Sequence, residues 1–260
     1  MEKRTDGFLI SKKEHQKDFI FGIRAVLEAL NADQEIDKIL LNKEQNNEMI
    51  KEVIQLAKTK GVPISKVPDG KFNRITRKNH QGVIAYVSAI SYASLDNVID
   101  ACFSKGVAPL ILMLDRITDV RNFGAIARTA EVAGVHALVI PEKGSAQINS
   151  DAVKTSAGAL NFLPICRVRN LYYTILDLKK MGLNVVSVTE KTDRQLFHAD
   201  FSVPTVLVLG SEEDGISNEL LGVSDEFVKI PVHGQIESLN VSVAAAVSIY
   251  EAVRQRISTQ

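Results

Sequence analysis

The segment IPVHGQIESLNVSVA, from Ile230 to Ala244, decides the fold class of this chain. It begins at the end of a short strand-like run, breaks at Pro231 and Gly234, and leads into a helix-like stretch. The same order of features occurs in DRITDVRNFGAIAR, residues 115–128, and in LGSEEDGI, residues 209–216. In an open α/β sheet, ligands bind at the carboxyl ends of the strands, where such loops gather. The three segments therefore predict one composite site.

Strand-like and helix-like stretches alternate around these segments. Apolar runs typical of strands buried on both faces lie at 109–114, 135–140, 184–188 and 205–209, with a shorter run at 227–230. Helical patterns lie between or after them, at 124–133, 171–181, 217–221 and 240–257. This alternation predicts an α/β fold with a mainly parallel sheet.

The first part of the chain forms a pattern of its own. Residues 1–18 are polar and charged and predict a flexible tail, whereas residues 19–88 are periodic enough for a small separate domain. Residues 89–108 predict a linker that contains a helix near 95–103, and residues 109–260 predict the larger domain. The expected elements of the small domain are a helix at 22–30, a strand at 36–41, a helix at 46–60, and strands at 62–67 and 82–87.

Composition excludes several classes of protein. The chain has 260 residues, is 45% hydrophobic, and balances 31 basic against 31 acidic side chains. Residues 1–88 hold 16 Lys and Arg against 12 Asp and Glu, a net charge of +4, so the remainder carries −4. Cys102 and Cys166 give neither a disulfide framework nor metal-ligand spacing, and we expect buried thiols. No apolar run predicts a signal peptide or a membrane span, so we expect a reducing cytoplasm.

A cationic segment in the small domain is a candidate RNA contact. KFNRITRKNH, residues 71–80, places Lys71, Arg74, Arg77 and Lys78 around Phe72. Phosphates attract clustered Lys and Arg, and an aromatic ring offers a stacking face. A solvated amphipathic turn with Phe72 in the core fits the composition equally well.

Several familiar sites are absent from the sequence. It has no G-x-G-x-x-G dinucleotide motif, no phosphate-binding P-loop and no G-x-S-x-G nucleophile motif. His233 follows a proline and could act as a base, but a surface role is the commoner one for a loop histidine. The polar residues left at the strand ends are suited to orienting two substrates for a direct displacement; they are Asn122, Arg128, Glu212, Ser238 and Asn240.

Each of these residues also has an ordinary structural alternative. Asn122 can cap the helix that follows it, and Glu212 can pair with a surface lysine. Ser238 and Asn240 can cap the last helix. Only their joint presence at strand ends of one domain favours a site.

The three segments resemble the three motifs of the SpoU (TrmH-type) branch of the SPOUT RNA methyltransferases. The similar stretches are N-F-G-x-x-x-R at 122–128, L-G-S-E-x-x-G at 209–215, and I-P-x-x-G-x-x-x-S-L-N-V-S-V-A at 230–244. FGIRAV at 21–26 and HQGV at 80–83 resemble the small ribosomal-protein-L30-like domain that precedes the methyltransferase domain in part of this family. One position departs from the pattern, because Glu213 stands where the second motif usually has glycine.

The resemblance implies a trefoil knot in the carboxyl-terminal domain, preceded by an L30e-like RNA-binding domain. It implies S-adenosyl-L-methionine as the cofactor, no metal, and a homodimer through the 240–257 helix, whose apolar residues surround most of its circumference. Arg128 would activate the attacking hydroxyl, or stabilise the developing alkoxide and hold an RNA phosphate. Glu212 would orient Arg128 or the loop, and Asn240 and Ser238 would position RNA and cofactor. The cofactor positions carried over by motif are Thr189, Glu190, Gly210, Ile230, Ser238 and Leu239.

The resulting hypothesis is methyl transfer to the ribose 2′-hydroxyl of an RNA, with a guanosine of 23S rRNA as the expected target. A tRNA methyltransferase of the same family, a ribosome-associated RNA-binding protein without catalysis, and an α/β enzyme acting on a small molecule remain the alternatives.

Overall fold

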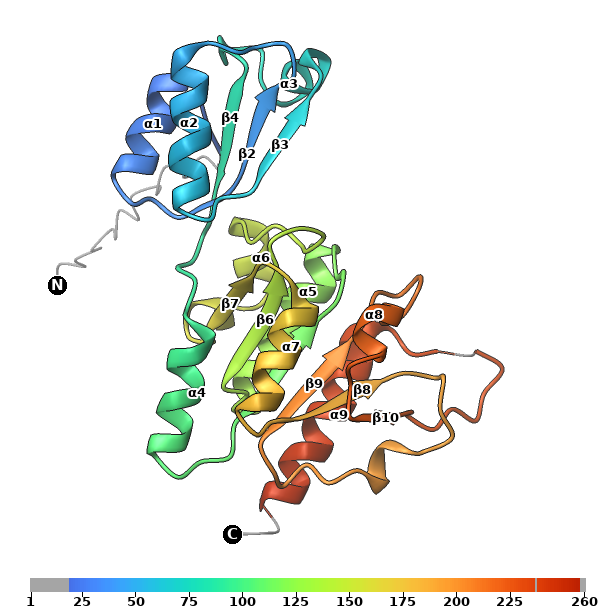
Figure 1. Cartoon of the computed structure of the whole chain (residues 1–260). Coiled ribbons are helices and arrows are strands. Elements are labelled where there is room, and N and C mark those ends of the chain that lie inside the picture. Colours follow the sequence, from blue (N-terminus) through green and yellow to red (C-terminus); the bar gives the residue numbers. More distant parts are fainter. Residues whose placement is uncertain (1–18, 237, 258–260) are drawn as a thin grey trace, which may run out of the picture.

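The computed structural model describes residues 19–236 and 238–257, and the tail predicted at 1–18 lies outside the described residues. The chain forms two α/β units joined by one connecting segment (Figure 1). We call residues 19–88 the N-terminal unit and residues 95–257 the C-terminal unit. The α/β class and the mainly parallel larger sheet agree with the sequence prediction.

The N-terminal unit contains a mixed four-stranded sheet in the order β1-β4-β2-β3. Strand β4 is antiparallel to both β1 and β2, and β2 is parallel to β3. Helices α1 and α2 pack against one face of this sheet. The elements are β1 (Phe19–Phe21), α1 (Ile23–Asn31), β2 (Ile36–Asn42), α2 (Glu48–Thr59), β3 (Ile64–Val67), α3 (Asp69–Ile75) and β4 (Val83–Val87).

Local sequence signals explain the ends of α2. The Asn47 side chain accepts a hydrogen bond from the backbone N–H of Ile50 at 2.9 Å, as an N-cap does. At the other end Gly61 has φ +65°, the left-handed conformation that glycine adopts without strain. The sequence prediction of this helix is confirmed, whereas the short β1 and α3 were not predicted.

The C-terminal unit contains six strands in the order β10-β8-β9-β5-β6-β7, and every pairing is parallel. All of the predicted strands and helices are present, and β7 and α6 are additional. The strands are β5 (Leu110–Leu114), β6 (Ala137–Pro141), β7 (Ile165–Val168), β8 (Asn184–Val188), β9 (Thr205–Leu209) and β10 (Glu226–Val228). The α-helices are α4 (Leu95–Ser104), α5 (Val120–Val132), α6 (Ser150–Thr155), α7 (Leu171–Lys180), α8 (Asn218–Leu221) and α9 (Val241–Ile257).

Helices cover both faces of this sheet. Buried side chains of α5 and α9 pack with Leu112 and Leu138 on one face, and those of α4 and α7 pack with Met113 and Val206 on the other. Helix α4, which the sequence placed within a linker, contributes Ile99 to the second of these clusters. Both cysteines are buried free thiols, as predicted.

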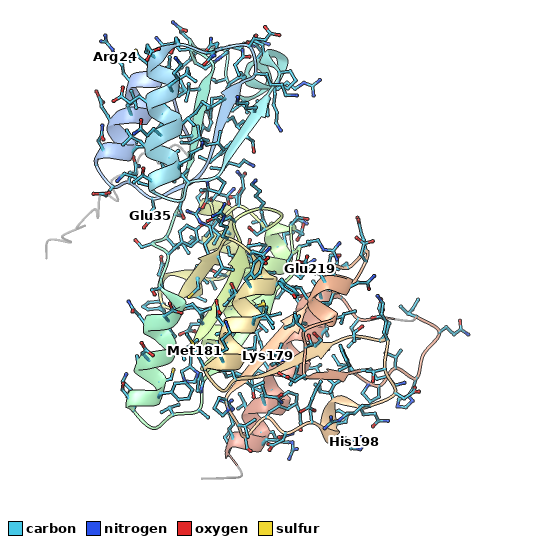
Figure 2. The ribbon with its side chains drawn as sticks, in the orientation of Figure 1. Arg24, Glu35, Lys179, Met181, His198 and Glu219 are labelled. Carbon is cyan, nitrogen blue, oxygen red and sulfur yellow. The ribbon has the colours of Figure 1, made fainter. Side chains whose placement is uncertain are left out.

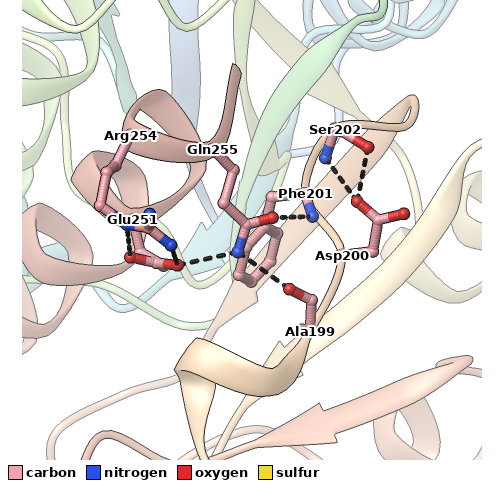
Figure 3. A network of polar contacts seen from close by, with 7 residues as sticks. All are labelled: Ala199, Asp200, Phe201, Ser202, Glu251, Arg254 and Gln255. Atoms are coloured by element: carbon pink, nitrogen blue, oxygen red, sulfur yellow. Dashed lines mark hydrogen bonds and ion pairs between the residues drawn. The ribbon is translucent and has the colours of Figure 1, made fainter. Parts of the chain in front are cut away.

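Helix α9 is fastened at its end by a polar network (Figure 3). The Gln255 amide accepts from the N–H of Phe201 at 2.8 Å and donates to the carbonyl of Ala199 at 3.0 Å. Glu251, only 7% exposed, accepts from Gln255 and from two guanidinium nitrogens of Arg254 at 2.8–2.9 Å. These contacts hold the segment before β9 against the last turns of α9.

The two units meet beside the carboxyl ends of β6 and β7. The N–H of Ala89 donates to the carbonyl of Ile148 at 3.0 Å. The N–H of the preceding Ser88 donates to the carbonyl of Glu35, which is labelled in Figure 2, at 2.9 Å. Arg167 of β7 reaches β2, where its guanidinium lies 3.7 Å from the Asp37 carboxylate and 4.1 Å from the centre of the Tyr92 ring. Tyr92 donates its hydroxyl to Asp37. We call Asp37, Tyr92 and Arg167 the interdomain joint.

Burial affects the titration of this joint. The side chains of Arg167 and Asp37 are 12% and 10% exposed. Burial raises the pKa of Asp37 above its ordinary value, although Tyr92 and Arg167 oppose the shift. Burial and the Asp37 charge also raise the pKa of Tyr92. The joint therefore links β2 of the N-terminal unit to β7 of the C-terminal unit through a largely buried group.

Candidate functional site

Two neighbouring cavities lie at the carboxyl ends of β5, β8 and β9. Cavity A, of about 430 Å³, is lined by residues of the 116–122 segment, Gly144, the 211–214 loop and Val241. Cavity B, of about 490 Å³, is lined by residues at the ends of β8 and β9, by the same loop extended to Gly215, and by part of the segment 229–244. The residues of that last part are Lys229, Ile230, Val232, Ser238, Leu239, Asn240, Val241 and Ala244. The loop that follows β9 therefore separates the two cavities and contributes to both.

The three segments singled out in the sequence meet at Asn240. Its side-chain NH₂ group donates to the side-chain amide oxygen of Asn122 at 3.0 Å and to a carboxylate oxygen of Glu212. The same Glu212 oxygen lies 3.4 Å from the backbone nitrogen of Val241, at the start of α9. The side-chain oxygen Oδ1 of Asn240 accepts from the backbone N–H and the hydroxyl of Ser242. The prediction of one composite site agrees with this junction, which we call the Asn240 junction.

The structural alternatives for these residues have different outcomes. Asn122 is not the cap of α5, because Asp119 accepts from the N–H groups of Arg121 and Asn122 at 2.9 and 2.8 Å. Glu212 contacts Asn240 and has no lysine partner among the described residues. Asn240 does accept from the first turn of α9, so it serves the helix and the junction together.

Glycine is required at one position of the second segment. A Cβ on Gly210 would lie 2.0 Å from the backbone carbon of Gly215, which is far closer than atoms tolerate. Ser211 and Gly215 exchange backbone hydrogen bonds at 3.0 and 3.1 Å and so close the loop tightly. Glu213 does not have a positive φ, and its loop therefore accommodates a side chain without backbone strain.

Sequence reasoning missed Arg116. Its guanidinium donates to Asp214 and to the carbonyl of Gly215, both at 3.0 Å, and lies 3.4 Å from Asp115. Asp115 in turn accepts from the N–H of Ser217 at 2.7 Å. Arg116 thus ties the end of β5 to the loop after β9. Arg116 has φ +60°, and its partners lie about 100 positions along the chain. For these reasons no nearby sequence pattern could predict its role.

Cavity B gathers every position that the family motifs assigned to cofactor. Thr189 and Gly210 are buried at its base, whereas Glu190 and Leu239 lie at its exposed side. Apolar walls and several carboxylates in one cavity match a ligand with a flat aromatic part and a positive charge. The cofactor candidates among its lining residues are Thr189, Glu190, Gly210, Ile230, Ser238 and Leu239.

The predicted cations lie elsewhere. Arg128 is exposed on α5 and lines neither cavity. Phe72 is fully buried and stacks on His80 with 4.9 Å between ring centres, so it belongs to the core and offers no stacking face. The side chains exposed around it in the N-terminal unit are Lys71, Arg74, Arg77 and Lys78.

Other site types find no support in the structure. His233 is exposed and lines neither cavity. Within residues 19–236 and 238–257, no three His, Cys, Asp or Glu side chains come together in a way that could hold a metal ion. No helix in the same ranges is long and apolar enough to cross a membrane.

Comparison with known proteins is consistent along almost the whole chain. Residues 109–250 match the SpoU rRNA Methylase family, and residues 19–93 match the RNA 2′-O ribose methyltransferase substrate binding domain. The chain is 35% identical over 241 residues to a putative TrmH family tRNA/rRNA methyltransferase, YacO, of Bacillus subtilis, covering 93% of this chain and 97% of the relative. It is also 35% identical to the 23S rRNA (guanosine-2′-O-)-methyltransferase RlmB of Ralstonia nicotianae, covering 91% and 95%.

A solved structure is similar at the level of the fold. The SpoU methyltransferase AviRb from Streptomyces viridochromogenes, in complex with the cofactor AdoMet, matches with a TM-score of 0.58 and 26% identity, covering 92% of this chain and 90% of that one.

Proposed function

The chain belongs to the SpoU rRNA methylase family, and as an S-adenosyl-L-methionine-dependent RNA ribose-2′-O-methyltransferase it needs an RNA target, which we propose is a guanosine of 23S rRNA. The relative named RlmB, at 35% identity over nearly the whole chain, supports this target. A tRNA target is the second candidate, because the YacO relative is named for both tRNA and rRNA.

The proposed catalytic site rests mainly on the Asn240 junction, which joins the two cavities. Cavity B fits the cofactor, because Thr189, Ile230 and Leu239 line it and the missing Cβ of Gly210 lets the lining loop close tightly on Gly215. S-adenosyl-L-methionine supplies, when bound, a methyl group on a positively charged sulfur. Glu190 and Glu212 at the same cavity provide negative charge suited to holding such a cation.

Cavity A is the proposed place of the target ribose. Asn122 and Glu212 line it and share Asn240, so a change at any one of them shifts the others. Much of the catalysis then comes from orientation, which brings reacting atoms to about 3–3.5 Å. No side chain of the junction is a nucleophile, and a direct displacement needs none.

Arg128 is proposed to act at the site of a second copy of the chain. A guanidinium with a pKa above ~12 does not serve as an ordinary base in proteins, so its role would be to stabilise the developing alkoxide and hold a phosphate. Arg128 lies on the exposed side of α5 with Arg121 and Val132, and α5 packs along α9.

An exposed apolar stripe beside Arg128 supports a homodimer. Val132 of α5 is 67% exposed, and on α9 Val243, Tyr250 and Ile257 are 47%, 49% and 68% exposed. Val243, Tyr250 and Ile257 are seven residues apart along α9 and therefore lie on one face of this helix. A row of large exposed apolar side chains on one helix supports a covering partner. If that partner is a second copy of the chain, it would bring its Arg128 to the cavities of the first copy.

The remaining features implied by the family are also part of the proposal. They are a trefoil knot in the segment that ends in α9, an L30e-like identity for the N-terminal unit, RNA contact by Lys71, Arg74, Arg77 and Lys78, and a cytoplasmic location. The match of residues 19–93 to a substrate-binding domain supports the RNA contact.

Methylation mapping tests the target. Purified protein with S-adenosyl-L-methionine and either 23S rRNA or total tRNA should give one new 2′-O-methylated guanosine in the rRNA alone. A methyl group on tRNA alone would transfer the proposal to the second candidate. Gly210→Ala is the negative control, because the added Cβ collides with the backbone of Gly215 and must displace the loop that lines cavity B.

The dimer has a separate test. Val243→Asp places a charge on the exposed apolar stripe of α9, where burial against a second copy without a partner for the charge is costly. Light scattering should show monomers, and methyl transfer should fall with the dimer fraction. A monomeric parent protein with full activity would contradict the shared site.

A further inference from the structure

One face of the N-terminal sheet is only partly covered. Its other face packs on α1 and α2 through Ile39, Leu41 and Val83. On the partly covered face, Phe72 and Ile75 of α3 pack against Leu40 and other buried side chains of the sheet. Toward β1, the face continues beyond α3 into half-buried aromatic residues.

Those aromatic residues form a single row with a lysine. Phe19 of β1 is paired in register with Tyr86 of β4, and Tyr86 is paired with Lys38 of β2. The ring centres of Phe19 and Tyr86 are 6.2 Å apart, and the Lys38 ammonium lies 5.4 Å from the centre of the Tyr86 ring. Phe21 extends the row, 6.3 Å from Phe19. We call Phe19, Phe21, Tyr86 and Lys38 the aromatic row.

The aromatic row opens toward positive charge. Burial and the nearby Lys71 both lower the pKa of Lys38, although Asp37 opposes this shift. Lys71 begins the exposed cationic series of α3 and the loop after it, which continues with Arg74, Arg77 and Lys78. A surface that places two ammonium groups close together attracts an anion.

We propose that the aromatic row is a stacking platform for unpaired bases of the RNA substrate, with Lys38 and the α3 cations holding the adjoining phosphates. Bases stack on aromatic side chains standing on a sheet, and each stacked base contributes about 1–3 kcal/mol. Duplex RNA keeps its bases stacked within the helix and offers only its backbone and grooves. The platform therefore selects single-stranded RNA. This inference rests on the proposed function only for the identity of the RNA.

Conservative ring removal tests the platform. In the full-length double variant Phe19→Leu/Tyr86→Leu, leucine keeps apolar volume on the sheet and removes the stacking faces. Binding of a short fluorescein-labelled single-stranded RNA should weaken at least about fivefold, whereas binding of the same sequence as a duplex stays unchanged. Tyr173→Leu, at a tyrosine 64% exposed on α7, is the matched control and should bind as the parent does.

Lys38→Gln separates charge from stacking. It should flatten the salt dependence of single-strand binding, because fewer counterions are released, while the leucine variant keeps the parental slope. Equal single-strand affinity of the leucine variant and the parent, with unchanged thermal unfolding, would overturn the platform. A changed oligomeric state with unchanged RNA affinity would also overturn it and would assign the face to protein contact.

These measurements require no methyl transfer. If the parent protein bound neither the single-stranded nor the duplex RNA, the proposed function itself would be contradicted. If the parent protein bound and methylated RNA, and the leucine substitutions left its single-strand affinity unchanged, only the stacking platform would be contradicted.

Discussion

The N-terminal unit and the paired cavities present opposite charges. The surface of α3 and its following loop shows four exposed cations and one exposed carboxylate, Asp69, around the buried Phe72. Cavity A is lined by four carboxylates and one cation, Arg116, whose guanidinium is already engaged by Asp214 and Gly215. The acidic side chains of cavity A are Asp119, Glu212, Glu213 and Asp214.

The contrast assigns different tasks to the two regions. Three of these carboxylates, Glu212, Glu213 and Asp214, also line cavity B, where they favour the positively charged cofactor. In cavity A the same charges repel the phosphates that flank the target ribose, so little RNA affinity originates there. Affinity for RNA must then come mainly from the basic unit, and the interdomain joint holds that unit beside the strand ends. The one cation that catalysis needs in the acidic cavity would be brought by a second copy.

The largest expected effect concerns that cation. Arg128→Ala should lower methyl transfer by ~10²-fold or more while leaving S-adenosyl-L-methionine binding intact, because Arg128 lines neither cavity of its own chain. Arg128→Lys should not restore activity, since the planar fork is lost. Single-turnover assays and calorimetric titration measure the two quantities.

A complementation experiment shows which copy supplies Arg128. Mixing inactive Arg128→Ala and inactive Asn240→Ala chains forms mixed dimers, in which one of the two sites combines an intact junction with an intact arginine. Roughly a quarter of parental activity should return in an equal mixture. No recovery in demonstrably mixed dimers would place Arg128 in the site of its own chain and remove the contrast between the regions.

The basic unit gives the next largest effect. Changing Lys71, Arg74, Arg77 and Lys78 to Ala should weaken RNA binding about tenfold or more and flatten its salt slope by up to ~3, as expected for four lost phosphate contacts. The substrate concentration at half-maximal rate should rise, while the rate at saturating RNA stays near parental. An unchanged salt slope would mean that the cluster faces only solvent.

The sequence predicted the long elements and that the three polar segments come together, but not the contacts between them. β1, β7 and α6 have three, four and six residues, too few for a period to emerge. Asn122 and Asn240 were singled out separately, yet their hydrogen bond spans 118 positions, and no spacing rule reaches that far. The Arg167 contacts with β2 span 130 and 131 positions for the same reason. The capping role of Asp119 was readable, because aspartate before a helical pattern is a known start signal.

A smaller effect is expected from the carboxylate that departs from the family pattern. Glu213 is exposed in the loop shared by both cavities, so Glu213→Gln should raise RNA affinity about two- to fivefold at low salt. The gain should vanish at high salt because surface charges are screened. Glu219→Gln, at an exposed carboxylate of α8 labelled in Figure 2, removes the same charge away from the cavities and should change nothing.

The smallest effect separates a structural carboxylate from the acidic cavity. Arg254 holds the pKa of Glu251 below its ordinary value, with Gln255 adding to the effect and burial opposing it (Figure 3). A depressed pKa in the folded state means that the ionised group stabilises the fold above its unfolded pKa of 4.5, and that this contribution is lost as pH falls through the lower folded value. Glu251→Gln should therefore unfold at a lower temperature than the parent at neutral pH, and the difference should shrink below about pH 4.5. Thermal melts of parent, Glu251→Gln and the Glu219→Gln control across this range measure the effect. Because Glu251 lines neither cavity, the Glu251→Gln variant should bind RNA and cofactor as the parent does at neutral pH. Altered cofactor binding would show that the carboxylate of Glu251 belongs to the acidic region after all.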